Sequence, residues 1–180
     1  MTVANPIPSP EWELYQPLVG DTMLELGNKI TKGTSYKQYF ESIGFKHTSV
    51  DWNGNDGALV FDLRKPLDLG TFDMVTNIGT TEHVSEQTQV WENVHNAVKI
   101  GGVLVSTTPA AGHWWWHGEW YPHPAFYHQF AERNGYMLDI CEMMKEHPIK
   151  MVFARMTKTA DVPFMMPDAE TMFYNKQRPR

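Results

Sequence analysis

Short apolar runs, each followed by a turn residue, recur along the first two thirds of the chain. The first ends at Gly27, and the most regular one ends at Gly79. Apolar runs of four to eight residues bounded by turn signals are typical of buried strands. The pattern therefore predicts five strands, over Thr22–Leu26, His47–Asp51, Ala58–Phe61, Phe72–Ile78 and Val103–Thr107.

Segments with apolar residues three and four positions apart lie between these strands and predict helices. Ser35 is a suitable N-cap for a helix whose apolar face runs from Tyr36 to Ile43 and which ends at Gly44. Residues 86–99 have the same periodicity and stop at Gly101-Gly102. A third helix begins near Phe126 and ends near Asn134-Gly135.

The two ends of the chain have a different character. Residues 1–20 contain four prolines and predict an extended lead-in with a short helical turn at Trp12–Tyr15. Tyr136–Glu142 and Lys150–Thr157 predict an antiparallel strand pair, and residues 158–180 predict an irregular tail. Strands that alternate with helices indicate an α/β fold. We expect one domain over 1–180, with a Rossmann-like, mostly parallel sheet, a closing antiparallel strand and helices on both faces.

Composition excludes several classes of protein. The 180 residues contain 15 basic and 21 acidic side chains, for a formal net charge of −6, and a single cysteine, Cys141. One cysteine rules out a disulfide framework and a cysteine-based zinc site. An acidic chain without a Lys/Arg cluster is not expected to bind a nucleic-acid backbone. No apolar run approaches the roughly 20 residues of a membrane span. We therefore expect a cytoplasmic protein with no membrane partner, of open oligomeric state.

Polar residues at the predicted strand ends suggest a nucleoside site. The carboxyl ends of parallel strands share one edge of the sheet, where such sheets bind ligands. Gly27 allows close backbone approach, Asp51 can accept from a ribose diol, and Asp62 can accept from an exocyclic amine. Structural alternatives exist, because Asp51 can cap the turn before Asn53-Gly54, Asp62 can pair with Arg64 or Lys65, and Glu82 can begin a helix.

Six motifs in a fixed order carry a family resemblance. They are Met23-Leu24-Glu25-Leu26-Gly27, Val50-Asp51, Phe61-Asp62-Leu63, Phe72-Asp73-Met74-Val75 running to Glu82-His83-Val84, Lys99-Ile100-Gly101-Gly102-Val103-Leu104-Val105, and Gly135-Tyr136. Over residues 20–157 this order resembles the class I S-adenosylmethionine-dependent methyltransferases. The first motif departs from the family pattern, since only Gly27 is in place and Gly33 is displaced.

The resemblance implies S-adenosylmethionine as cofactor and methyl transfer to a small-molecule or glycan-like acceptor. It assigns the cofactor to ten residues and assigns no metal. These residues are Glu25, Gly27, Asn28, Asp51, Trp52, Asp62, Leu63, Asn77, Gly79 and Glu82. The altered glycine loop leaves a second hypothesis, a non-catalytic binding module of the same fold that has lost its cofactor.

The segment 113–123 is unusual because it holds four tryptophans and three histidines. It follows the fifth predicted strand and should lie over the acceptor site. One interpretation is a lid in which His113, His117 or His123 acts as the general base. Another is a metal site of His113 and His117 with Glu119 or His123, as in a metal-dependent hydrolase. In the third, the tryptophans only pack against the sheet.

Overall fold

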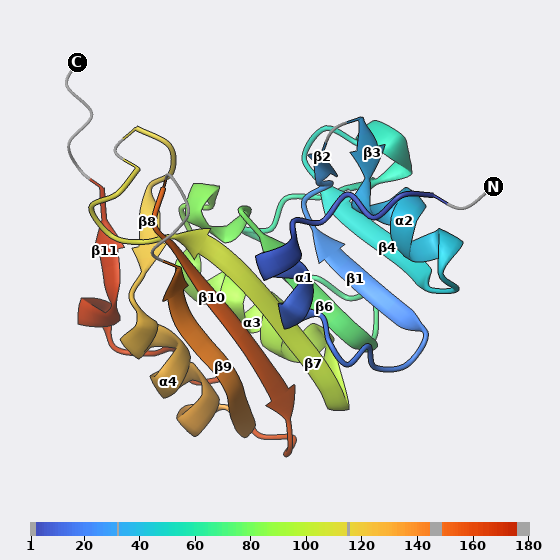
Figure 1. Ribbon diagram of the computed structural model, residues 1–180. Helices are drawn as coiled ribbons and strands as arrows, with labels where there is room; N and C mark the ends of the chain where they lie inside the picture. Colours follow the sequence, from blue (N-terminus) through green and yellow to red (C-terminus); the bar gives the residue numbers. More distant parts are fainter. Residues whose placement is uncertain (1–2, 32, 115, 145–148, 176–180) are drawn as a thin grey trace.

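The computed structural model describes residues 3–31, 33–114, 116–144 and 149–175. Within these ranges, seven strands form one sheet in the order β5-β4-β1-β6-β7-β10-β9 (Figure 1). The first five strands in this order, from β5 through β4, β1 and β6 to β7, are parallel. Strand β10 pairs antiparallel with both β7 and β9. The strands are β1 (Thr22–Leu26), β4 (Lys46–Asp51), β5 (Leu59–Val60), β6 (Phe72–Ile78), β7 (Val98–Pro109), β9 (Tyr136–Met144) and β10 (Met151–Lys158). The expected mostly parallel sheet with a closing antiparallel strand is confirmed.

Helices cover both faces of this sheet, as expected. Side chains alternate along each strand, so Met23 and Met74 face one side while Leu24 and Val75 face the other. The first side packs against α1 and α2, and the second packs against α3 and α4 (Figure 1). The helices are α1 (Ser9–Leu14), α2 (Tyr36–Ser42), α3 (Gln87–Ala97) and α4 (Pro124–Arg133).

The start of α2 follows from a reciprocal pair of hydrogen bonds. The Ser35 hydroxyl accepts from the Gln38 backbone N–H at 3.1 Å, and the Gln38 side chain accepts from the Ser35 N–H at 3.4 Å. This capping box satisfies two backbone donors that the first helical turn leaves unpaired. The predicted N-cap is therefore confirmed.

The predicted boundary between the helix over residues 86–99 and the strand over Val103–Thr107 is wrong. Helix α3 ends at Ala97, and β7 begins at Val98, before the two glycines. The register between β6 and β7 shifts between Phe72 and Met74, so the strand continues through Gly102 on an irregular path. A Cβ on Gly102 would lie 2.9 Å from the Asp73 carbonyl oxygen, which shows how closely the two backbones approach there.

Two short antiparallel strand pairs lie outside the predicted strands. Strands β2 (Ile30–Thr31) and β3 (Thr34–Ser35) pair between β1 and α2. Strand β8 (Trp120–Pro122), inside the aromatic segment, pairs with β11 (Met172–Tyr174), so the tail is not irregular throughout. Pairs this short, and in the second case this distant in sequence, leave no periodic signal. Three 3₁₀ turns, η1 (Asn55–Gly57), η2 (Thr81–His83) and η3 (Ala169–Thr171), complete the elements of the described ranges.

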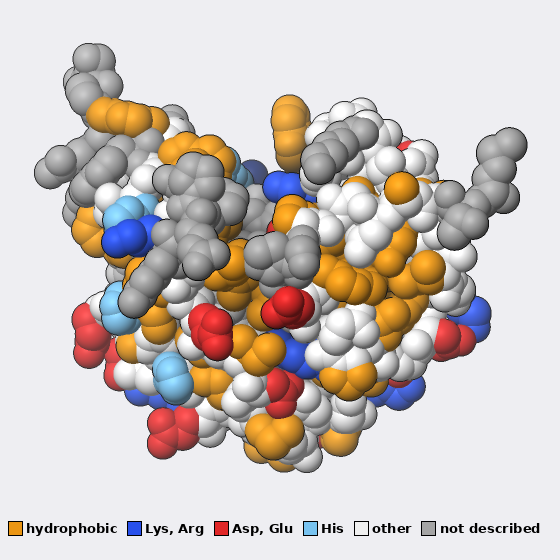
Figure 2. Space-filling model, viewed as in Figure 1, with side chains coloured by type: hydrophobic (Ala, Val, Ile, Leu, Met, Phe, Trp, Pro, Cys, Tyr) orange, Lys and Arg blue, Asp and Glu red, His pale blue; other side chains and the backbone are white. Residues whose placement is uncertain are grey.

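The buried guanidinium group of Arg155 holds the N-terminal lead-in against the sheet. Arg155 on β10 donates to the carbonyl oxygens of Leu14 at 2.8 Å and Pro17 at 3.0 Å. These bonds hold α1 over the sheet, close to the strand ends. In the part of the chain described, no helix is long and apolar enough to cross a membrane. Charged side chains of both signs are scattered over the face shown in Figure 2, with apolar side chains between them.

Candidate active site

A cavity of about 770 Å³ lies where β1, β4 and β6 end. Strand β1 is the point at which the chain order of the sheet reverses, since β4 lies on one side of it and β6 on the other. Crevices at such switch points are the usual ligand sites of open α/β sheets. Seven of the residues assigned to the cofactor line this cavity, namely Gly27, Asn28, Asp51, Trp52, Asp62, Leu63 and Gly79.

The loop after β1 depends on glycine at its first position. Gly27 has φ +82°, and a Cβ there would lie 2.4 Å from Oγ1 of Thr80. The Thr80 hydroxyl in turn donates to the Leu26 carbonyl at 2.7 Å. The loops after β1 and β6 therefore touch at this point, and no larger residue fits between them.

Glu25 holds the same loop from beneath. Its side chain is buried, its Oε1 accepts from the Lys29 N–H at 2.9 Å, and its Oε2 lies 3.0 Å from Nε2 of His47. Burial raises the pKa of the Glu25 carboxyl. The geometry gives Glu25 a positioning role toward residues 27–29, which differs from the direct contact implied by the resemblance.

Asp51 and Asp62 each combine a local structural bond with a place in the cavity wall. Asp51 Oδ1 accepts from the Asn53 N–H at 3.1 Å. Asp62 accepts from Nε and Nη2 of Arg64, both at 2.9 Å, and this partner lowers the pKa of its carboxyl to about 2. Both aspartates therefore make the structural bonds that the sequence left open as alternatives. Both residues also line the cavity, and a carboxylate can accept more hydrogen bonds than these.

Asn77 is placed differently from the other assigned residues. Its side chain is fully buried and bonds to the Thr81 hydroxyl at 2.9 Å, the Ser106 hydroxyl at 3.0 Å and the Thr81 N–H at 3.0 Å. These bonds fix the turn η2 to β6 and β7. Asn77 therefore shapes the segment that carries Glu82.

A second cavity, of about 310 Å³, adjoins the first. The two share Lys29, Ile78 and Gly79 in their walls. The second is lined by residues from the lead-in, α2, the turn η2, the aromatic segment and the β9–β10 end of the sheet, including Pro8, Glu11, Tyr36, Glu82, Trp114, His117, Met144 and Met151. Gly79 thus borders both spaces, and we refer to this shared border as the passage.

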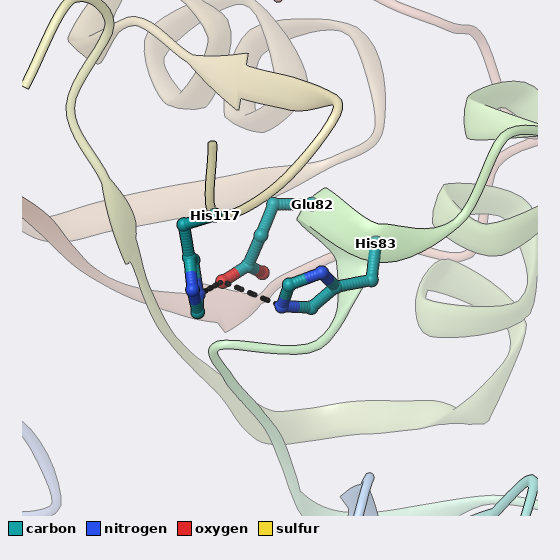
Figure 3. A group of neighbouring side chains, drawn as sticks. All are labelled: Glu82, His83 and His117. Atoms are coloured by element: carbon teal, nitrogen blue, oxygen red, sulfur yellow. Dashed lines mark ion pairs between the residues drawn. The ribbon is translucent and has the colours of Figure 1, made fainter. Parts of the chain in front are cut away.

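Glu82, His83 and His117 gather at this passage (Figure 3). Glu82 Oε1 lies 3.5 Å from Nε2 of His117 and 3.8 Å from Nε2 of His83. The two imidazole rings meet edge to face, with centroids 4.6 Å apart. Glu82 is 1% exposed, and neither of its carboxylate oxygens has a hydrogen-bond partner among the described residues.

Backbone contacts hold the aromatic segment against Glu82. The Glu119 N–H donates to the Glu82 carbonyl at 2.8 Å. A Cβ on Gly118 would lie 2.8 Å from Cγ of Glu82, so the segment passes too closely for a side chain there. The ring of Trp114 stacks on the imidazole ring of His117, with the ring centroids 3.6 Å apart and an interplanar angle of 7°. His117 is therefore fixed beside Glu82.

The other predicted histidines lie elsewhere. Residues 111–114 and 116–117 form turns and a bend instead of a helix, so His113 and His117 do not share a helix face. His113 is exposed, and Nδ1 of His123 accepts from the Ala125 N–H at 3.3 Å at the start of α4. Trp120 packs on Tyr174 with ring centroids 4.6 Å apart, whereas Trp115 lies outside the described residues.

Sequence reasoning missed most of the residues that line the second cavity. Glu11, Lys29 and Tyr36 are among them. Tyr36 lies on the apolar face of α2, so the sequence pattern predicts a core residue. In the structure its hydroxyl donates to Glu11 at 3.0 Å. Glu11 reaches the site only because Arg155 fastens the lead-in across the sheet. No local pattern signals such a placement.

Comparisons with known proteins agree with this fold. A family model described as a methyltransferase domain matches residues 21–106. No curated protein sequence gives a significant match. Three solved structures illustrate the likeness in fold. The 1,6-didemethyltoxoflavin-N1-methyltransferase of Burkholderia thailandensis has a TM-score of 0.64 at 11% identity, over 84% of this chain and 78% of its own.

The other two cover similar shares of the chain. A TehB-like S-adenosylmethionine-dependent methyltransferase from Corynebacterium glutamicum has a TM-score of 0.59 at 18% identity, over 82% of this chain and 86% of its own. The O-methyltransferase of a trans-AT PKS multienzyme of Brevibacillus brevis has a TM-score of 0.60 at 11% identity, over 82% and 71%. The methyltransferase-domain model thus matches just under half of the chain, and the sheet order and these structures give the chain the fold of the class I S-adenosylmethionine-dependent methyltransferases.

Proposed function

We propose that this protein transfers the methyl group of S-adenosylmethionine, held in the larger cavity, to a small and largely apolar acceptor in the smaller one. The observation that carries the proposal is the shared wall of Lys29, Ile78 and Gly79. Two ligands that occupy adjoining cavities can meet at Gly79, which is the arrangement a direct transfer between them requires.

The larger cavity suits a nucleoside that carries an amino-acid tail. Its volume lies within the range of small-molecule sites, roughly 300–1,000 Å³. Asp51 has a carboxylate oxygen for the ribose hydroxyls, Asp62 has one for an exocyclic amine, and the 82% exposed ring of Trp52 can stack on the base at the rim. When bound, the cofactor supplies a methyl group activated by a positively charged sulfur.

The smaller cavity favours an apolar acceptor over a glycan. Ile78, Met151 and Phe153 contribute hydrophobic surface, and Trp114 adds an aromatic face. Polar side chains are confined to Glu11, Lys29, Thr31, Tyr36, Glu82, Thr107 and His117 among the lining residues. Such a lining binds a hydrophobic body and orients one or two polar groups. The Burkholderia thailandensis structure of the same fold was solved with the small molecule 1,6-didemethyltoxoflavin bound.

The protein's contribution to this chemistry is mainly alignment and exclusion of water. Trp114 and His117 line the smaller cavity and Glu119 lines the larger one, and the close contact between Gly118 and Glu82 holds this part of the chain there. Of the three histidines proposed as a base, His117 lines the acceptor cavity, so the geometry favours it over His113 and His123 for a role at the acceptor. A cytoplasmic location stays a prediction.

Isothermal titration calorimetry with S-adenosylmethionine and S-adenosylhomocysteine tests the proposal. We expect one binding site for each ligand, with dissociation constants below about 100 μM, which corresponds to roughly −5.5 kcal/mol. Adenosine, which lacks the amino-acid tail, should bind more weakly. Absence of binding heat at millimolar ligand, from protein shown to be folded by circular dichroism, would favour the cofactor-free binding module instead.

A further inference from the structure

We propose that Glu82, His83 and His117 form a binding site for one divalent first-row transition ion, with Zn²⁺ as the best match. The site lies between the two cavities, since His83 lines the larger one while Glu82 and His117 line the smaller one (Figure 3). Binding of the ion stands on these three side chains alone. Its role at the acceptor rests on the proposed function.

The donor atoms are already assembled. One ligand atom from each residue can be chosen so that all three lie within 4.8 Å of one another, and the two measured N–O separations are 3.5 and 3.8 Å. Bonds of about 2.1 Å to a tetrahedral ion would place neighbouring donors roughly 3.4 Å apart. Small side-chain rotations therefore suffice to close the set around an ion.

The state of Glu82 is an independent observation that points to a cation. A buried carboxylate that lacks hydrogen bonds is costly, and proteins compensate such groups with paired charges or metal ions. Glu82 is 1% exposed, and both its oxygens lack a hydrogen-bond partner among the described residues. Both nearby side chains are imidazoles, which coordinate metals in their neutral form.

The surroundings keep the ligands in place. His117 is pinned by the stacked ring of Trp114, and the Glu82 backbone is tied to the aromatic segment through Glu119. His83 belongs to the turn η2, which Asn77 fixes to the sheet. Metal sites need such support, because loosely held ligands lose the required geometry.

The donor set determines the kind of ion and the part it plays. Two imidazole nitrogens and one carboxylate oxygen suit Zn²⁺, Fe²⁺ or Co²⁺ better than Mg²⁺, which prefers oxygen. Three protein ligands leave at least one position open, toward the acceptor cavity. There the ion would bind an acceptor hydroxyl and lower its pKa, as zinc does for water.

The resulting transfer balances without a redox step. The acceptor hydroxyl releases its proton to solvent, and a lone pair on the ion-bound oxygen forms the new bond to the methyl carbon. The carbon–sulfur bond breaks, and its electron pair stays on sulfur. The products are a methyl ether, S-adenosylhomocysteine and a proton, and the ion keeps its charge. An acceptor hydroxyl on an otherwise apolar molecule is therefore the expected substrate class.

Direct metal titration tests the site. Untagged, chelator-treated protein is titrated with Co²⁺, followed by its visible absorption, and with Zn²⁺ by competition calorimetry. We expect one ion per chain, with affinity reduced at least about 100-fold in Glu82→Gln and His117→Asn. His83→Asn should also weaken binding, and because its side chain is 44% exposed this variant should fold normally. His128→Asn, which changes an exposed histidine on α4, is the matched control and should bind as the wild type does.

Two outcomes overturn the proposal. One is wild-type binding no tighter than that of Glu82→Gln, and the other is binding that none of the three substitutions weakens. Titration of the metal-free protein with S-adenosylhomocysteine separates this result from the proposed function. If the nucleoside binds and the metal does not, the methyltransferase proposal stands without the ion. If the metal binds and the nucleoside does not, the ion site stands and the methyltransferase proposal fails.

Discussion

Glu82 Oε1 lies 3.5 Å from Nε2 of His117 and links the turn after β6 to the segment after β7. The pair stands at the passage between the two cavities, and its carboxylate is buried without hydrogen bonds from the described residues. A carboxylate in such a place favours function over stability, because burying a charge costs folding free energy. The stability of the metal-free protein reports directly on this balance.

We predict that Glu82→Gln stabilises the metal-free protein. Gln has nearly the same shape and removes the buried charge, so the free energy of unfolding should rise by about 1 kcal/mol. For a chain of this length that corresponds to an increase of roughly 2–4 °C in melting temperature. Thermal unfolding by circular dichroism in excess chelator measures it. A loss of stability would mean that an ion pair with His117 or His83 stabilises the fold and that the carboxylate is not a cost.

Asp51→Ala should weaken nucleoside binding without unfolding the protein. Loss of hydrogen bonds to a charged group costs about 1.5–3 kcal/mol, which is roughly 10- to 150-fold in the dissociation constant of S-adenosylhomocysteine. Asp51 also accepts from the Asn53 N–H, so melting temperature is measured in parallel. Asp68→Ala, an exposed acid that is not among the lining residues, serves as the control. Equal affinity in both variants would refute the ribose assignment.

Gly27→Ala and Gly33→Ala form a matched pair. Both glycines have a positive φ near +80°, and an L-residue pays about 1–2 kcal/mol in this conformation. Only at position 27 would the added Cβ meet Thr80, since nothing lies within 4 Å at position 33. Gly27→Ala should therefore lose more stability in urea unfolding, and also lose nucleoside affinity. The excess loss should shrink in a Thr80→Ala background, and an excess that persists would place the strain elsewhere.

Asp73 predicts the acid sensitivity of the sheet. Its carboxylate accepts from Lys99 at 2.9 Å and from the Thr22 hydroxyl at 2.7 Å. Lys99 first, and then Thr22, hold the pKa of this carboxyl well below its usual range. A lowered folded-state pKa adds stability above the unfolded value of about 3.9, and this stability is lost as the pH falls through the folded-state pKa.

We therefore expect Asp73→Asn to lower the free energy of unfolding by about 2 kcal/mol at pH 7. The difference in free energy of unfolding between the variant and the wild type should stay constant between about pH 5 and 8. It should narrow below pH 4, because only the wild type has a carboxylate at position 73 that takes up a proton. Urea unfolding at pH 7, 5 and 3 measures both quantities. A difference that does not change with pH would show that the hydrogen bonds, and not the charge, carry the effect.

The sheet was predictable because its central strands carry a local signal. Strands β1 and β6 have the predicted bounds, since each is a short, largely apolar segment that stops at a glycine with positive φ. The start of α2 was equally accessible through the capping residue Ser35. Strands β8 and β11 were not, because three residues at 120–122 pair with three at 172–174 and neither has a pattern of its own.

Part of the candidate site was equally predictable from local sequence signals, and part was not. Gly27, Asp51 and Gly79 lie in one cavity because parallel strands bring their carboxyl ends to one edge, a rule that needs no tertiary detail. Glu25 and Asn77 lie within their strands, so their side chains turn into the protein and brace the loops. The approach of His117 to Glu82 depends on the tertiary contacts of Gly118 and Glu119 with Glu82, and only the three-dimensional structure reveals them.

A crystal structure of the protein with S-adenosylhomocysteine is the decisive test of the proposed cofactor site. We expect the ribose hydroxyls on Asp51, the base between Trp52 and Asp62, and the sulfur beside Gly79, facing the cavity that His117 lines. A ligand bound elsewhere on the sheet, or a crystal that stays free of ligand after soaking at millimolar concentration, would contradict it.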